Sequence, residues 1–182
     1  MNTVHLPSYR LNTLLYFLFL GLGIWIWILL PDRIPIKFDF DGNPTKWAEN
    51  KHENLILLFA ICTFSFWKLH LFQRYLLNDP DSSLLNIPYK KQFLKLPIAR
   101  KQRVMIRLNR MMGKLNTGML LIYMFILAMM YYTAVQPDSF MLPLANYSLI
   151  LVIVLSVVFP VTEYFGIKAM IRQKLQEEGL YE

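Results

Sequence analysis

Residues 11–30 have the sequence LNTLLYFLFLGLGIWIWILL, a run of positions without a charged side chain. A transmembrane helix needs about 20 mainly apolar residues to cross the hydrocarbon core of a bilayer, so this stretch predicts a membrane span. Hydrophobic residues make up 55% of the chain and charged residues 17%, whereas an average soluble domain has about 25% charged residues. Three further apolar stretches lie at 54–72, 115–135 and 140–163. We therefore predict an all-α integral membrane protein with four transmembrane helices.

The first two stretches need a closer look. The first is longer than the apolar core of a signal peptide and ends at Pro31 without a small-residue cleavage site, which predicts a retained anchor. Lys68 interrupts the stretch 54–72 near its end, where a lysine can extend its ammonium group to the interface.

Cys62 is the one cysteine and cannot form an internal disulfide. The composition excludes a soluble enzyme domain, a disordered chain and a disulfide scaffold.

The charges between the spans predict their orientation. The segment 68–114 holds 11 basic and 2 acidic residues, whereas the segment 31–54 holds 4 basic and 5 acidic residues. Because basic loops stay on the cytoplasmic side of a membrane, we predict that 68–114 and both termini are cytoplasmic. The protein is then a multi-pass membrane protein. The net charge of +7 reflects this topology and an anionic inner leaflet, and we expect no nucleic acid partner.

The spans divide the chain into two helical pairs separated by a basic loop. Within that loop, the stretch 77–96 contains Asp-Pro-Asp-Ser-Ser and a second proline, which predicts an irregular linker. The predicted units are a two-helix unit at 1–75 with an outer loop at 31–53, a basic cytoplasmic loop at 76–114, a second two-helix unit at 115–170 and a cytoplasmic tail at 171–182.

Residues 98–113 have the pattern of a basic cytoplasmic amphipathic helix. Val104, Leu108 and Met111 recur at helical spacing beside a basic face. We expect the helix to lie along the inner leaflet, where each cation near anionic lipid contributes about 1 kcal/mol. Docking of an acidic protein is the alternative. The lipid-facing basic residues are Arg100, Arg103, Arg107, Arg110 and Lys114.

The outer loop contains the pattern of a short extracellular β-hairpin. Apolar residues alternate with polar residues or proline from Ile34 to Phe40, and this period of two indicates a strand. Asp-Gly-Asn-Pro follows at 41–44, a combination typical of a turn in which glycine takes positive φ. We therefore predict a β-hairpin-like loop between the first two spans.

The sequence from Leu30 to Lys51, LPDRIPIKFDFDGNPTKWAENK, resembles the signature of the bacterial membrane family called domain of unknown function 1648. The family pattern has a proline, an Ile-Pro pair, a histidine, a glycine, a Pro-Asp pair, a tryptophan and a lysine. Lys37 stands where the family has histidine and Thr45 where it has aspartate. We therefore expect no metal-binding or pH-sensing role at that position.

This family also forms the N-terminal part of SdpI-type immunity proteins, which protect a cell against a secreted toxin and can signal its presence. The resemblance implies a location in a bacterial plasma (inner) membrane and an outer loop that contacts an extracellular peptide or toxin. A second copy of the chain is a further candidate partner. The expected binding residues are those of the motif, namely Pro31, Ile34, Pro35, Lys37, Phe38, Gly42, Pro44, Trp47 and Lys51.

The remaining ionisable residues predict no catalytic site, no metal centre and no cofactor. A calcium site in the turn and a zinc site at the start of the second span are the metal alternatives, but turn chemistry and the helix dipole explain the same residues. We expect a non-enzymatic protein of toxin immunity or envelope sensing, with a small transporter or transporter subunit and a structural membrane partner as alternatives. The metal alternatives would use Asp39, Asp41 and Asn43 for calcium, and Glu49, His52 and Glu53 for zinc.

Overall fold

The computed structural model describes residues 7–75, 79–82, 85–136 and 141–180. Four helices in these residues are long and apolar enough to cross a membrane, which confirms the predicted four-span fold. The first residue of the predicted span 140–163 lies outside the described residues. The elements are α1 (Pro7–Leu29), β1 (Ile34–Phe38), β2 (Pro44–Ala48), α2 (Lys51–Tyr75), α3 (Lys90–Phe93), α4 (Ile98–Val135) and α5 (Met141–Glu177).

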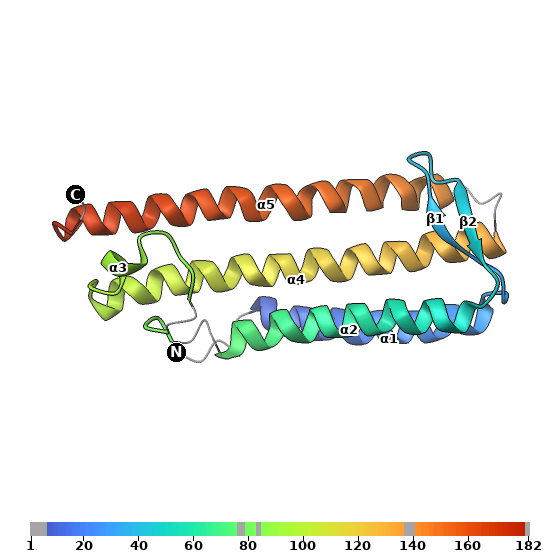
Figure 1. Cartoon of the computed structure of the whole chain (residues 1–182), viewed down its shortest axis with the longest axis horizontal. Helices are drawn as coiled ribbons and strands as arrows, with labels where there is room; N and C mark the ends of the chain where they lie inside the picture. Colours follow the sequence, from blue (N-terminus) through green and yellow to red (C-terminus); the bar gives the residue numbers. More distant parts are fainter. Residues whose placement is uncertain (1–6, 76–78, 83–84, 137–140, 181–182) are drawn as a thin grey trace.

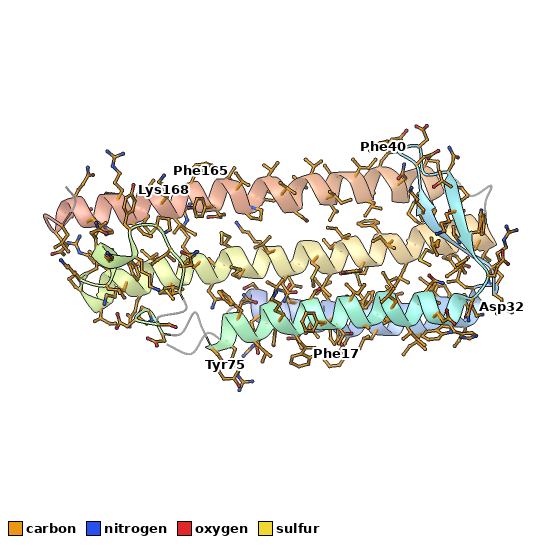
Figure 2. All side chains as sticks on the ribbon, in the orientation of Figure 1. Phe17, Asp32, Phe40, Tyr75, Phe165 and Lys168 are labelled. Atoms are coloured by element: carbon orange, nitrogen blue, oxygen red, sulfur yellow. The ribbon has the colours of Figure 1, made fainter. Side chains whose placement is uncertain are left out.

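The helix α4 lies between the other long helices (Figure 1). α5 runs along one side of α4, and α1 and α2 run together along the other. The two strands cross one end of the bundle, here called the hairpin end, and α3 and the C-terminus lie at the opposite end, here called the loop end. Apolar side chains such as Phe17 and Phe165 point away from the bundle (Figure 2), as expected for residues that face lipid.

The half of α4 nearer the hairpin end packs on α1 and α2 through large apolar side chains. Phe19 of α1, Leu55 of α2 and Leu120 of α4 are all fully buried in this cluster. The ring of Tyr16 stacks on that of Phe66, with centroids 4.2 Å apart. In lipid, such packing stabilises helix association through van der Waals contact rather than through the removal of apolar surface from water.

Buried polar side chains join α4 to α1 and α2 nearer the loop end. Asn12 Nδ2 donates to the backbone oxygen of Gly113 at 2.9 Å, and Asn12 Oδ1 accepts from Thr117 Oγ1 at 2.6 Å. Gln73 Nε2 donates to the backbone oxygen and to Oδ1 of Asn109, both at 3.0 Å. These bonds fix the rotation of α4, because polar groups within the membrane need partners inside the protein.

α4 is one continuous helix that covers both the predicted amphipathic helix at 98–113 and the predicted span at 115–135. Its 38 residues rise roughly 57 Å, about twice the thickness of the hydrocarbon core, so one end extends beyond the bilayer. α5 likewise continues past the predicted end of its span at 163 and through much of the predicted tail. No proline separates the two predicted parts of α4, and α5 gives the extension a partner along its length.

The apolar face predicted for residues 98–113 packs on protein. Val104, Leu108 and Met111 are buried in one cluster with Ile167 and Ile171 of α5. The described residues of the stretch predicted as an irregular linker contain one short helix, α3, and also pack in this small core. They contribute four buried side chains, Leu85, Ile87, Phe93 and Leu96.

Three of the five basic residues predicted to face lipid instead contact α5. Two of them share one carboxylate: Arg107 Nε lies 3.0 Å from Glu163 Oε2, and Lys114 Nζ lies 2.7 Å from Glu163 Oε1. Arg103 and Arg110 are exposed, and in the described part of the chain neither makes an ion pair. The basic face therefore serves partly as a contact between helices.

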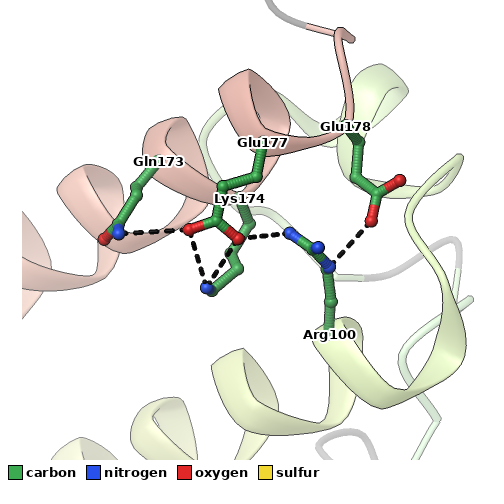
Figure 3. Close-up of polar contacts among 5 residues, drawn as sticks. All are labelled: Arg100, Gln173, Lys174, Glu177 and Glu178. Atoms are coloured by element: carbon green, nitrogen blue, oxygen red, sulfur yellow. Dashed lines mark hydrogen bonds and ion pairs between the residues drawn. The ribbon is translucent and has the colours of Figure 1, made fainter.

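The third of these contacts lies near the end of α5 (Figure 3). Arg100 bonds to Glu177 through NH1, and its Nε lies 2.7 Å from Glu178 Oε1. Lys174 Nζ and Gln173 Nε2 also donate to the Glu177 carboxylate, at 2.9 Å and 3.1 Å. This network holds the start of α4 beside the end of α5.

We expect Asn12→Leu to lower the midpoint of thermal unfolding of the purified protein by about 2–4 °C. The change removes two hydrogen bonds between helices, each of roughly 0.6 kcal/mol in a membrane protein. Thr13→Val is the matched control, since the Thr13 hydroxyl bonds to Tyr9 within the same helix. Equal midpoints for the two variants would contradict the assigned role of Asn12.

Candidate functional site

The hairpin is built around one tight turn. β1 and β2 pair antiparallel, with Ile34 opposite Ala48 and Pro35 opposite Trp47. Between the strands, Gly42 has a φ of +86°, a conformation that residues with a Cβ rarely adopt. The predicted β-hairpin-like loop with a positive-φ glycine is therefore confirmed.

Asp39 holds this turn together. Its Oδ1 accepts hydrogen bonds from the backbone N–H groups of Asn43 at 2.7 Å and Asp41 at 3.0 Å, and its Oδ2 accepts from Asn43 Nδ2 at 3.2 Å. The backbone hydrogen bond from Asn43 is the main cause that lowers the pKa of the Asp39 carboxyl from its ordinary value of 3.8. Both oxygens thus already serve the turn, which explains these residues without a calcium ion.

Lys51 joins the two ends of the loop. Its Nζ donates to the backbone oxygen of Leu30, at the end of α1, and lies 3.8 Å from Asp32 Oδ1. A cation at this position satisfies a carbonyl that has no partner in the helix and is favoured by the helix dipole. Asn50 Oδ1 accepts from the backbone N–H of His52 at 3.0 Å and so caps the start of α2. The motif lysine therefore links the end of α1 to the start of α2.

The motif tryptophan lies on β2 beside a charged pair. The guanidinium carbon of Arg33 is 5.5 Å from the centroid of the Trp47 ring, and Arg33 Nε is 3.2 Å from Glu49 Oε1. The three residues of the zinc alternative have separate partners. Among the described residues, 7–75, 79–82, 85–136 and 141–180, there is no group of three side chains that could hold a metal ion. These partners are Arg33 for Glu49, Trp27 for His52 and Asn50 for Glu53.

A buried asparagine of α5 attaches the turn to the bundle. Asn146 is 6% exposed, and its Nδ2 donates to the backbone oxygen of Phe40 at 3.0 Å. A Cβ on Gly42 would lie 3.1 Å from the Asn146 side chain, so glycine also permits this close approach. Phe40 itself lies at the tip of the hairpin and is 93% exposed (Figure 2).

A cavity of about 420 Å³ lies between β1 and the hairpin-end halves of α4 and α5. This volume is in the usual range for small-molecule sites, which is about 300–1,000 Å³. Apolar side chains dominate its lining, and the charged residues Lys37 and Asp39 belong to the hairpin side. The helices contribute Ile126, Met129, Met130, Asn146, Leu149, Ile150 and Ile153.

The comparison with known families matches this part of the chain. Residues 14–63 match the family model described as Domain of unknown function (DUF1648). These 50 of the 182 residues, here called the DUF1648 domain, are the part of the chain that is similar to the family. This domain contains most of α1, the whole hairpin and the first half of α2. No curated protein and no solved structure gives a significant match to the chain.

The motif residues of the DUF1648 domain divide into two groups. Pro35, Lys37 and Phe38 line the cavity, as does the exposed Phe40. The others do not line it, and several of them shape or anchor the hairpin, as described for Gly42 and Lys51. That second group consists of Pro31, Ile34, Gly42, Pro44, Trp47 and Lys51.

The α5 side of the site was not among the residues predicted from the sequence. Asn146 is the one amide side chain between Asp138 and Glu163, and such isolation is a weak sign of a buried contact. The DUF1648 domain ends before α4 and α5, so the cavity combines the domain with helices outside it.

We expect Asn146→Leu to speed amide hydrogen exchange in residues 39–43 roughly fivefold, because one hydrogen bond of about 1 kcal/mol holds the turn to α5. Asn54→Leu is the matched control, since Asn54 bonds to the backbone oxygen of Asn50 at the start of its own helix. Unchanged exchange in Asn146→Leu would show that the turn is held by other contacts.

Protonation of Asp39 should loosen the turn. Because the folded pKa is lowered, the carboxylate stabilises the turn above its unfolded pKa, and this contribution is lost as the pH falls through the folded pKa. A carboxyl NMR titration should give a midpoint below 3.8, and Asn43→Ala, which removes one side-chain hydrogen bond, should raise it. A midpoint at or above 3.8 in the unaltered protein would contradict this assignment.

Proposed function

We propose that this multi-pass membrane protein is a non-enzymatic receptor of the cell envelope, acting in toxin immunity or toxin sensing of the SdpI type. In this proposal the hairpin end faces outward from a bacterial plasma membrane and both termini are cytoplasmic. The cavity beside β1 binds an apolar part of an extracellular peptide or toxin. The support for the orientation is the excess of basic residues at the loop end.

The observation that carries the proposal is the cavity of about 420 Å³ beneath the motif strand. Its position at one end of the spanning helices makes it accessible to a ligand that partitions into the membrane surface. A membrane-active peptide has both apolar side chains and charged groups, and the cavity offers apolar walls from α4 and α5 beside charged residues from the hairpin.

Two side chains of the hairpin suit such a ligand. The Lys37 ammonium group makes no ion pair within the described residues, so it is available to a carboxylate of the ligand. Phe40 presents an aromatic ring at 93% exposure on the same strand end, and exposed aromatic side chains are common anchors in recognition. Lys37 thus puts a positively charged side chain where the family has a histidine.

The experiment compares a deletion strain with strains that express the protein or a variant, across a panel of secreted antimicrobial peptides and membrane-active toxins. We expect expression to protect against one agent, and Lys37→Gln or Phe40→Ala to weaken protection about tenfold through loss of a central contact. Trp47→Ala, which disturbs the strand opposite Pro35, should remove protection while the protein still inserts into the membrane.

Lys46→Gln is the matched control for Lys37→Gln. Lys46 pairs with Lys37 across the hairpin and is exposed, but it does not line the cavity. Protection that is unchanged in Lys37→Gln and Phe40→Ala would exclude the cavity as the binding site. The absence of protection across the panel would contradict immunity and direct attention to the transporter alternative, which substrate flux in proteoliposomes would test.

A further inference from the structure

A second groove lies in the other half of the bundle, between α1, α4 and α5. Its volume is about 450 Å³. The walls are mainly apolar, and they come close together where Gly118 of α4 faces Ser156 of α5, since a Cβ on Gly118 would lie 2.3 Å from Ser156 Oγ. Its apolar lining consists of Leu11, Leu121, Val152, Leu155, Phe159 and Pro160.

The end of the groove nearer the loop end is polar. Ser8 of α1 and Lys114 of α4 line this end. Lys114 Nζ lies 5.9 Å from the centroid of the Phe159 ring, so its charge is held over the mouth of the groove. The Ser8 hydroxyl oxygen is buried, and no hydrogen-bond partner for it lies among the described residues. The Lys114 cation thus lies at one end of an apolar channel.

This polar end lies at the depth of a lipid headgroup. The helical rise from Lys114 to Val135, the last residue of α4, is roughly 31 Å. The rise from Ser8 to Leu29, the last residue of α1, is also roughly 31 Å. The hydrocarbon core of a bilayer is about 30 Å thick. With the hairpin end at one surface, both residues therefore lie at the opposite boundary, where phosphate groups are found.

The charge at this boundary favours an anion. Lys114 and Arg107 share the single carboxylate of Glu163, which leaves one positive charge among the three groups. Arg110, one helical turn before Lys114, is exposed and makes no ion pair in the described residues. Cations outnumber carboxylates around the mouth of the groove, and its interior is apolar.

We propose that the groove binds an anionic phospholipid of the leaflet at the loop end. The phosphate group lies beside Lys114, and one acyl chain extends along Leu121 and Leu155 toward the centre of the membrane. The site is separate from the cavity under the hairpin, so its test is independent of the proposed function. By the positive-inside rule this leaflet is the cytoplasmic one, where anionic lipids give a negative surface.

The test uses the full chain purified in a zwitterionic detergent. Thermal unfolding is followed while phosphatidylglycerol or phosphatidylcholine with the same acyl chains is added. We expect phosphatidylglycerol to raise the unfolding midpoint about 2–4 °C more than phosphatidylcholine does. Lys114→Gln should reduce this additional rise of the unfolding midpoint roughly fivefold. Arg103→Gln, an exposed position on the same basic face outside the groove, should change it less than twofold.

A second pair of variants tests the acyl-chain part of the site. Leu155→Trp fills the groove and should abolish the additional stabilisation by phosphatidylglycerol. Leu151→Trp places the same ring on α5 at a position that is 58% exposed and outside the groove, and it should retain that stabilisation. Lys114→Gln leaves the apolar walls unchanged, so it tests the site even where Leu155→Trp impairs folding.

Three results would overturn the proposal. Equal stabilisation by the two lipids would exclude a site for the anionic headgroup. Equal losses in Lys114→Gln and Arg103→Gln would assign the effect to diffuse attraction over the basic face. Stabilisation by soluble glycerol phosphate as strong as that by phosphatidylglycerol would assign the site to a free phosphate rather than to a lipid.

Discussion

The packing of α4 between α5 on one side and α1 and α2 on the other is the interaction on which the rest of the structure depends. Within a bilayer, each helix satisfies its own backbone, so the arrangement is decided by side-chain packing and by hydrogen bonds between helices. α4 supplies both, through Leu120 in the apolar cluster and Asn109 in the polar contacts. Because α5 contacts the bundle mainly through α4, spaces remain beside α4 that the four helices do not fill.

The two main spaces differ because the ends of the bundle differ in chemistry. At the hairpin end, β1 covers one space, and the turn is attached to α5 through Asn146. Lys51 holds α1 and α2 together at the base of the same hairpin, so the strand is fixed at both of its ends. At the loop end, none of the described residues forms a strand over the groove, and its mouth is bordered by Lys114 and Ser8. The proposed peptide ligand of the first space and the proposed lipid of the second both rest on this difference.

Sequence patterns predicted the elements that depend on local physics. The spans follow from the length of apolar segments that a bilayer requires, and the hairpin follows from the period of two and from Gly42, whose φ is positive. The packing of residues 98–113 on α5 was not predicted, because an apolar stripe such as Val104 and Leu108 suits a lipid surface as well as a second helix. Only contacts with Ile167 and Ile171, far away in the chain, decide between them. Asn146 was missed for the same reason, since its partner Phe40 lies 106 positions earlier.

The basic residues of α4 combine two roles that the sequence suggested only in part. Their number predicts the orientation of the chain, and ion pairs with α5 carboxylates use Arg100, Arg107 and Lys114. Exposed ion pairs contribute about 0–1 kcal/mol each, so the buried apolar cluster around Ile167 supplies most of the attraction between α4 and α5 beyond the membrane. The ion pairs instead select one register, because Glu163 bonds to two cations that lie on one face of α4, two helical turns apart. That register places Lys114 at the mouth of the groove, where a cation can both hold α5 and meet a lipid phosphate.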